Sequence, residues 1–121
     1  MELSFIFRFL NAIKFLHWST QSYAEHKALD DAYSTLSAKL DEFVECFKGL
    51  KPEAPLILRS IDFEASPSPE EFATTLDFFN ALSHDFLNNI ERYNDTDSFT
   101  SMIDEMENCI FQVKYLLGFK A

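Results

Sequence analysis

One amphipathic pattern runs without interruption through residues 22–48, and it constrains the fold more than any other feature of the chain. Apolar or aromatic side chains recur there every three or four residues, which is the spacing of one face of an α-helix. Such a helix would be roughly 40 Å long. The sequence therefore predicts an all-α protein built from long amphipathic helices. The apolar face consists of His26, Leu29, Tyr33, Leu36, Leu40, Phe43 and Phe47.

Three further helical patterns cover residues 3–19, 69–93 and 98–117. A chain of 121 residues with 2 glycines is typical of one helical domain and argues against a turn-rich β fold. Ser68, Pro69 and Glu71 have the spacing of a capping box, so we expect the third helix to begin there. The predicted apolar faces are Ile6, Leu10, Ile13 and His17; Phe72, Leu76, Phe79, Phe86, Ile90 and Tyr93; and Phe99, Ile103, Met106, Ile110, Val113 and Leu117.

The connection between the second and third helices, about residues 49–68, is much longer than the other two. All 4 prolines fall within residues 52–69, which indicates irregular structure. Short connections make antiparallel neighbours, whereas a long middle connection allows the chain to cross the bundle. The pattern predicts a ferritin-like four-helix bundle with one long crossover. The alternative is an up-down-up-down bundle.

The net charge of −10 argues against several function classes. Nucleic-acid binding requires a basic face, and an anionic membrane surface would repel an acidic protein. Arg8, Asn11 and Lys14 interrupt the apolar amino-terminal pattern, so we expect an amphipathic first helix and not a signal peptide or membrane span. Cys46 and Cys109 lie in apolar helical patterns, which predicts buried thiols and a cytoplasmic location.

Potential metal ligands follow one flank of the long helical pattern. His26, Asp30, Asp41 and Glu45 would form a ribbon beside the apolar face. Asp30 and Asp41 would be roughly 16 Å apart along the helix axis, which is too far for one ion. Antiparallel packing about a two-fold axis would instead place the His26–Asp30 pair of one chain beside the Asp41–Glu45 pair of another, with His17 completing each site.

This pattern resembles Dps, the ferritin-like DNA-binding proteins of starved cells. The histidine-tryptophan pair of that family resembles His17–Trp18, and its later ligands resemble His26, Asp30, Asp41 and Glu45. The resemblance implies an inter-subunit iron site that oxidises Fe(II) with peroxide or oxygen. The phrase SYAEHKALDDAYSTLSAKLDEFVE and the ending VKYLLGF also look like small phage-encoded ferritin-like proteins of unassigned function, which implies the fold more than an activity.

A non-catalytic interaction protein is the rival class, and we favour it slightly. A small, acidic, phenylalanine-rich bundle could be a homodimer that binds a host or phage protein. A single histidine or carboxylate on a helix flank is more often structural or solvated than a metal ligand. Trp18, Tyr23 and Tyr33 could lie near a metal, but aromatic residues at helical spacing more often belong to the core.

Overall fold

The computed structural model describes residues 1–59 and 69–119, and these contain four α-helices. They are α1 (Ser4–Ser19), α2 (Tyr23–Leu50), α3 (Thr75–Ile90) and α4 (Asp97–Leu117). Two short 3-10 turns flank α3, namely η1 (Pro69–Glu71) and η2 (Glu91–Tyr93). The all-α prediction is confirmed.

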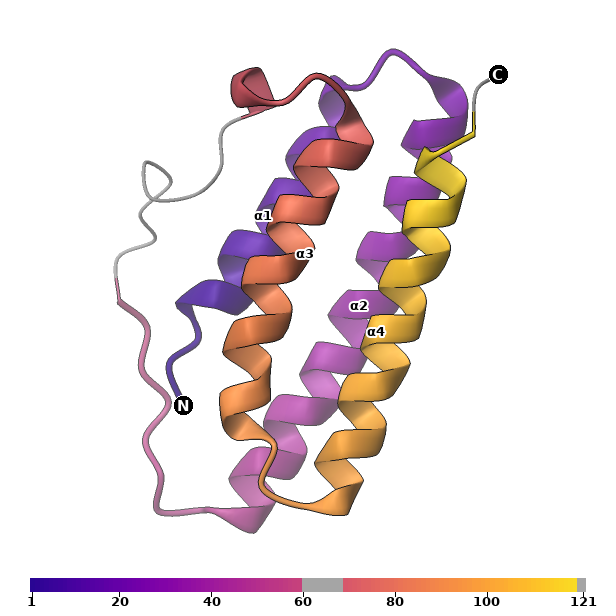
Figure 1. Ribbon diagram of the computed structural model, residues 1–121. Helices are drawn as coiled ribbons and strands as arrows, with labels where there is room; N and C mark the ends of the chain where they lie inside the picture. The colour runs from indigo at the N-terminus through magenta and orange to yellow at the C-terminus, as the bar shows by residue number, and fades with distance from the viewer. Residues whose placement is uncertain (60–68, 120–121) are drawn as a thin grey trace.

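The four helices pack as a bundle in which α1 lies beside α2 and α3, and α4 lies beside the same two helices (Figure 1). The α2 helix ends at the opposite end of the bundle from the start of α3, so these two helices run in the same direction. The long α2–α3 connection therefore spans the length of the bundle. This arrangement confirms the predicted four-helix bundle with a long middle connection and excludes the up-down-up-down alternative.

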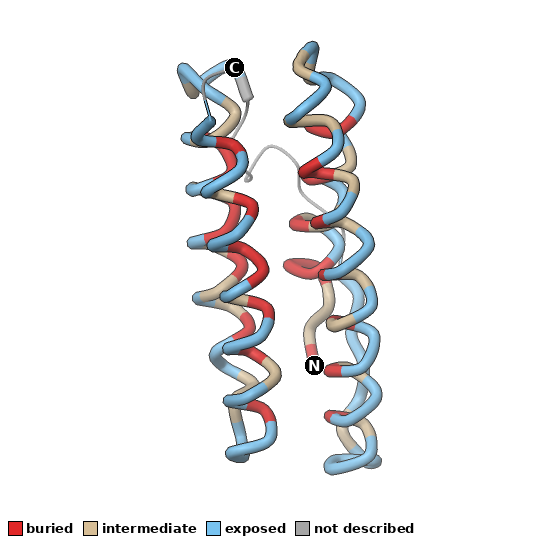
Figure 2. Tube along the Cα trace, turned by 90° about the vertical axis from the view of Figure 1, so that its right-hand side faces the viewer, coloured by how far each residue is buried: buried red, intermediate tan, exposed pale blue. Residues whose placement is uncertain are grey.

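The core is built from large apolar side chains of all four helices. Figure 2 shows that the buried residues lie on the helix sides that face one another. Phenylalanine rings supply the centre of the core: Phe9 of α1 stacks on Phe86 of α3 with ring centres 4.4 Å apart, and Phe43 of α2 lies 5.1 Å from Phe99 of α4. The predicted apolar faces supply most of this core. Fully buried members include Ile13, Leu29, Leu36, Phe43, Phe79, Phe86, Ile90, Met106 and Ile110.

The amino-terminal segment is fixed to the connection that follows α2. Glu2 pairs with Ile57 in an isolated parallel β-bridge. The Glu2 carboxylate accepts a hydrogen bond from the Ser4 backbone amide at the start of α1. Hydrogen bonding from Ser4, assisted by the nearby Arg59 guanidinium, holds the pKa of Glu2 below its usual value. The Glu2 carboxylate therefore caps the start of α1, because the N-cap residue, Leu3, has no side-chain acceptor.

The start of the third helix differs from the prediction. Its N-cap is Thr74, whose hydroxyl accepts a hydrogen bond from the Asp77 amide at 3.1 Å, and α3 begins at Thr75. Glu71 belongs to the separate turn η1, and Ser68 lies outside the described residues. The hydroxyl of Thr74, and not that of Ser68, therefore caps α3.

The prediction of two buried thiols is correct for only one of them. Cys109 on α4 is buried, and burial raises the pKa of its thiol. Cys46 on α2 is exposed, because its position on the helix lies away from α1 and α4. Within the described part of the chain, both cysteines are free thiols, and no helix there has the length and apolar character needed to cross a membrane.

Candidate functional site

Two of the predicted ligands, His17 and His26, form a reciprocal contact at one end of the bundle. His17 lies in the last turn of α1 and His26 in the first turns of α2, on either side of a short turn. Each ring Nδ1 lies 2.9 Å from the backbone carbonyl oxygen of the other histidine. The two rings stack with their centres 3.9 Å apart. We call this pair the histidine clasp.

The clasp fixes the protonation pattern of both rings. A carbonyl oxygen can only accept a hydrogen bond, so each Nδ1 must carry the proton that it donates. In a neutral ring, Nε2 then keeps its lone pair. This is the arrangement that proteins use to orient a histidine whose Nε2 binds a metal, but it is equally a way to satisfy the carbonyl of His17 at the open end of α1.

Beside the clasp, Glu25 forms polar contacts that reach a third helix. The Glu25 carboxylate accepts hydrogen bonds from the hydroxyl of Thr20 at 2.8 Å and from that of Thr75 at 3.0 Å. The N-cap Ser22 accepts a bond from the Glu25 amide at 3.3 Å. Glu25 therefore joins the α1–α2 turn to the start of α3, and this end of the bundle is held by polar contacts as well as by its core.

Asp30 lies next to the clasp, one turn of α2 after His26. Its Oδ1 atom is 3.9 Å from Nε2 of His17, and its side chain is 48 % exposed. His17 is almost completely buried, whereas His26 is half-buried. The structure therefore brings His17, His26 and Asp30 together. Imidazole and carboxylate are ligand types that suit Fe(II) or Mn(II), but these three side chains are not placed to hold one ion within a single chain.

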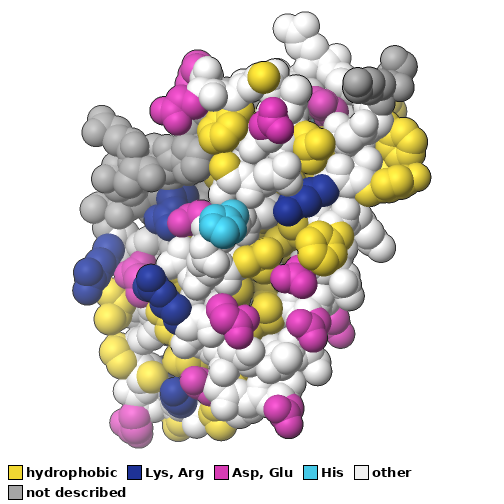
Figure 3. All heavy atoms as spheres, viewed as in Figure 1, with side chains coloured by type: hydrophobic (Ala, Val, Ile, Leu, Met, Phe, Trp, Pro, Cys, Tyr) yellow, Lys and Arg dark blue, Asp and Glu magenta, His cyan; other side chains and the backbone are white. Residues whose placement is uncertain are grey.

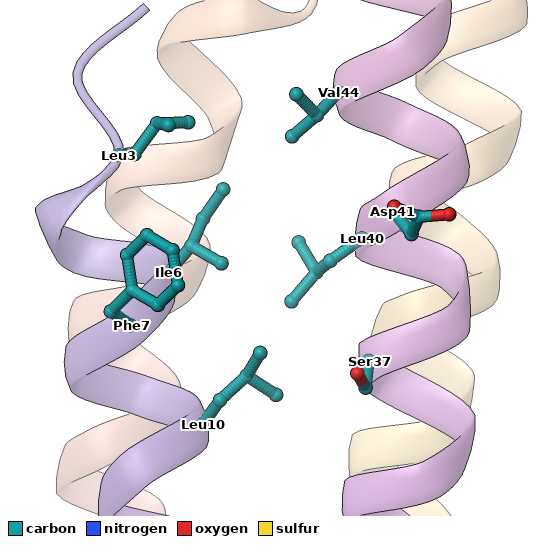
Figure 4. Close-up of a pocket in the computed structure, with 8 residues that line it drawn as sticks. All are labelled: Leu3, Ile6, Phe7, Leu10, Ser37, Leu40, Asp41 and Val44. Atoms are coloured by element: carbon teal, nitrogen blue, oxygen red, sulfur yellow. The ribbon is translucent and has the colours of Figure 1, made fainter. Parts of the chain in front are cut away.

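Asp41 and Glu45 lie about three turns further along α2, and both are exposed. Asp41 stands at the edge of a hollow of about 240 Å³ between α1 and α2 (Figure 4). Apolar side chains, including Leu10 and Val44, point into this hollow. Among the described residues, no group of three or more His, Cys, Asp or Glu side chains is placed to hold an ion within one chain. The predicted five-ligand set therefore requires a second copy, and it stays a prediction.

The aromatic residues near the clasp are not in the core. Trp18 is 72 % exposed and Tyr23 is 80 % exposed, so their prediction as core residues is wrong. Both lie at the α1–α2 end of the bundle, Trp18 near the end of α1 and Tyr23 at the start of α2. Tyr33 is half-buried, and the Lys14 ammonium nitrogen lies 4.5 Å from its ring centre and 5.7 Å from that of Trp18.

Sequence reasoning identified both histidines but missed what they bond to. The available signal was their position: one lies in the final turn of a predicted helix and the other in the first turns of the next. Helix ends leave carbonyl groups without partners, and side chains across a short turn are well placed to satisfy them. The contact of Glu25 with Thr75 depends on where the start of α3 packs, which the sequence pattern alone does not define.

The fold and the paired histidines define a small four-helix protein with a polar junction at one end. The chain belongs to a protein family described as a family of unknown function, DUF5856, whose model matches residues 17–117. The matched region begins at His17 and takes in both histidines of the clasp and all of α2, α3 and α4. The comparison with curated proteins gives no match, and neither does the comparison with solved structures.

Proposed function

We propose that this protein is a non-catalytic helical binding protein that works as a homodimer. The proposal rests on the many large apolar side chains that are exposed on the outer faces of the helices. Phe7, Phe15, Trp18, Tyr23, Phe111 and Tyr115 are all at least 40 % exposed. They lie on more than one face of the bundle, with Phe7, Phe15 and Trp18 on α1 and Phe111 and Tyr115 on α4. Exposed aromatic side chains are characteristic of protein–protein contacts.

The first surface is the α1/α2 face, which surrounds the hollow of Figure 4. We define it by Leu3, Phe7, Leu10, Lys14 and Trp18 with Asp30, Tyr33, Ser37, Asp41 and Val44. Phe7 lines the hollow and is 40 % exposed. An apolar hollow with an exposed ring beside it favours an interface in which a second surface covers both.

A second copy of the chain is the occupant that fits this face best. If a two-fold axis passes near Ser37, the two α2 helices run antiparallel, and each Phe7 can reach the other copy. Ser34, Ser37 and Ala38 are small and lie at the crossing point, so the two backbones can approach closely. A two-fold contact also makes the surface self-complementary, because each apolar half covers the equivalent half of its partner.

Homodimer formation is tested by sedimentation equilibrium of the wild type and of Phe7→Gln. We expect the wild type to have twice the 14.0 kDa chain mass at micromolar concentration, and the variant to weaken dimerisation at least about tenfold. Glutamine is a good helix former, so the substitution removes the ring without disturbing α1. Phe111→Gln on α4 is the matched control and should stay dimeric. A monomeric wild type would refute the homodimer.

Fe(II) binding at two inter-subunit sites is the second candidate function. Two observations favour it: the clasp leaves both Nε2 atoms without hydrogen bonds among the described residues, and Asp30 stands 3.9 Å from one of them. The same two-fold packing would bring Asp41 and Glu45 of the second copy towards this group. Like-charged carboxylates would then face each other, and a bound cation would offset their repulsion.

Calorimetric titration with Fe(II) under anaerobic conditions tests this second candidate. The metal hypothesis predicts saturable binding of about one ion per chain, which the double variant His26→Ala, Asp30→Ala should abolish. His26→Asn is the sharper variant, because the asparagine amide nitrogen replaces Nδ1 as a donor but offers nothing in place of Nε2. Asp104→Asn, Glu107→Gln is the control that removes the same type of charge elsewhere. Weak binding that all of these proteins share would reject a specific site.

A further inference from the structure

We propose that an exposed stripe along α4 binds a cationic amphipathic helix of a partner protein. This α4 stripe consists of Asp104, Glu107, Phe111, Tyr115 and Phe119. The inference rests on the proposed binding function and names the chemistry of the partner. It concerns a different surface from the α1/α2 face, because it lies on α4, which packs mainly against α2 and α3.

The spacing of the stripe places its members on one outer face. The intervals from Asp104 to Tyr115 are three, four and four residues, which is the repeat of a helix surface, and Phe119 follows after the end of the helix. Phe111 is 52 % exposed, Tyr115 is 69 % exposed and Phe119, just beyond the end of α4, is 60 % exposed. The rings of Tyr115 and Phe119 meet edge to face with their centres 4.8 Å apart. Phe111 lies one turn before Tyr115, and the Lys114 ammonium nitrogen lies 5.8 Å from the ring centre of Phe111. The apolar half of the stripe therefore consists of three exposed rings with one lysine beside the first of them.

A neighbouring hollow enlarges this aromatic half. It has a volume of about 360 Å³ and lies between the end of α4 and the start of α2, where Tyr23, Leu116 and Phe119 contribute to its walls. Figure 3 shows hydrophobic side chains gathered over the carboxyl-terminal part of α4. A surface with rings and an adjoining hollow suits the bulky apolar side chains of a helix that lies in a groove.

The other half of the stripe is acidic. Asp104 is exposed and Glu107 is half-buried, and neither forms an ion pair with another residue in the described part of the chain. In Figure 3 acidic side chains cover the same face below the hydrophobic group. The whole chain carries a net charge of −10, which adds to the attraction for a positive partner.

These two halves specify the partner. From Asp104 to Phe119 the stripe extends roughly 22 Å, which corresponds to a helix of about fifteen residues. Such a helix must present leucine-like or aromatic side chains at intervals of three and four residues over the rings. One or two turns further along, it must present lysine or arginine to Asp104 and Glu107. Complementary charge at one end also fixes the direction in which the partner lies.

The same charge pattern disfavours two other occupants. A second copy in antiparallel orientation would place carboxylates over aromatic rings, and a parallel copy would place carboxylates against carboxylates. An anionic membrane surface would be repelled by the acidic half. Binding of a second copy is still an outcome of the test, because it would appear as self-association in the absence of any peptide.

The test is selection of a displayed library of random peptides of about sixteen residues against the wild-type protein. We expect the enriched peptides to combine helical apolar spacing with lysine or arginine near one end. Their affinity should fall at least about tenfold in Phe111→Gln, Tyr115→Gln, since truncated interface aromatics have effects of this size. In Asp104→Asn, Glu107→Gln the affinity should fall and lose most of its dependence on salt. Phe111, Tyr115 and Asp104 are exposed and Glu107 is half-buried, and unchanged circular dichroism checks that the variants fold.

Three results would overturn the inference: no enrichment, enriched peptides without basic residues, or binding that the aromatic variant leaves unchanged. Enhanced self-association of the wild type relative to Phe111→Gln would assign the stripe to a second copy instead. Phe7→Gln separates this inference from the proposed homodimer. It should lose the dimer and keep peptide binding, whereas Phe111→Gln should keep the dimer and lose peptide binding.

Discussion

Replacing Phe86 with alanine is expected to destabilise the protein by about 3–5 kcal/mol, the range for removing a buried phenylalanine ring. Phe86 is completely buried on α3, and its ring stacks on that of Phe9 with 4.4 Å between centres. Phe5 lies on the same side, with its ring centre 6.0 Å away. The alanine variant would leave a cavity between α1 and α3 that these rigid rings cannot fill. Because small domains are stable by about 5–15 kcal/mol, this one change would remove much of the total.

Equilibrium unfolding in urea, followed by circular dichroism, measures this loss. Phe111→Gln is the matched control, because it removes the same ring from a position that is 52 % exposed. Its free energy of unfolding should stay within about 0.5 kcal/mol of the wild type. If Phe86→Ala cost no more than Phe111→Gln, α1 and α3 could not pack through these rings. The bundle arrangement itself would then be wrong.

The helices were predictable because each apolar face is repeated over several turns. Five of the seven residues predicted for the apolar face of α2 are buried, and so are all six of those predicted for α4. An error at one position therefore does not change the result. The long middle connection was equally clear from its prolines. It predicted that α2 and α3 run in the same direction, because a connection of that length can return along the whole bundle.

Helix starts and exposed aromatic residues were less predictable, for a physical reason. A helix face is buried only where another helix runs along it, and the sequence pattern does not say where the neighbours end. Trp18 and Tyr23 have helical spacing but lie at the end of the bundle, so they remain exposed. Two competing caps precede α3, and only packing decides that Thr74 begins the helix.

At the candidate site, too, contacts between residues close in the sequence were predictable, and contacts that need a distant or second chain segment were not. His17, His26 and Asp30 could be brought together by reasoning because a short turn joins their helices. The relation of Asp41 and Glu45 to this group depends on a second copy, and no pattern within one chain fixes that contact. The sequence therefore identified the candidate ligands, but it could not distinguish a structural clasp from a metal site.

A double-mutant cycle at the histidine clasp measures its contribution to stability. We expect His17→Ala to reduce the free energy of unfolding by about 1–3 kcal/mol, since it removes a buried donor and leaves His26 without its stacking partner. His26→Ala should cost a similar amount, because the carbonyl of His17 at the end of α1 loses its partner. The double variant should cost less than the sum, with a coupling of about 0.5–3 kcal/mol.

His17→Asn is the variant that separates the two roles of this residue. Asparagine places an amide nitrogen where Nδ1 stands, so it can still donate to the carbonyl of His26. If the clasp is structural, this variant should recover a large part of the stability that His17→Ala loses, as measured by urea unfolding without metal. If His17→Asn is as unstable as His17→Ala, the ring itself is essential and the carbonyl bond is not. Fe(II) binding lost in a stable His17→Asn protein would instead show that Nε2 is a ligand, because that atom is the one the substitution does not replace.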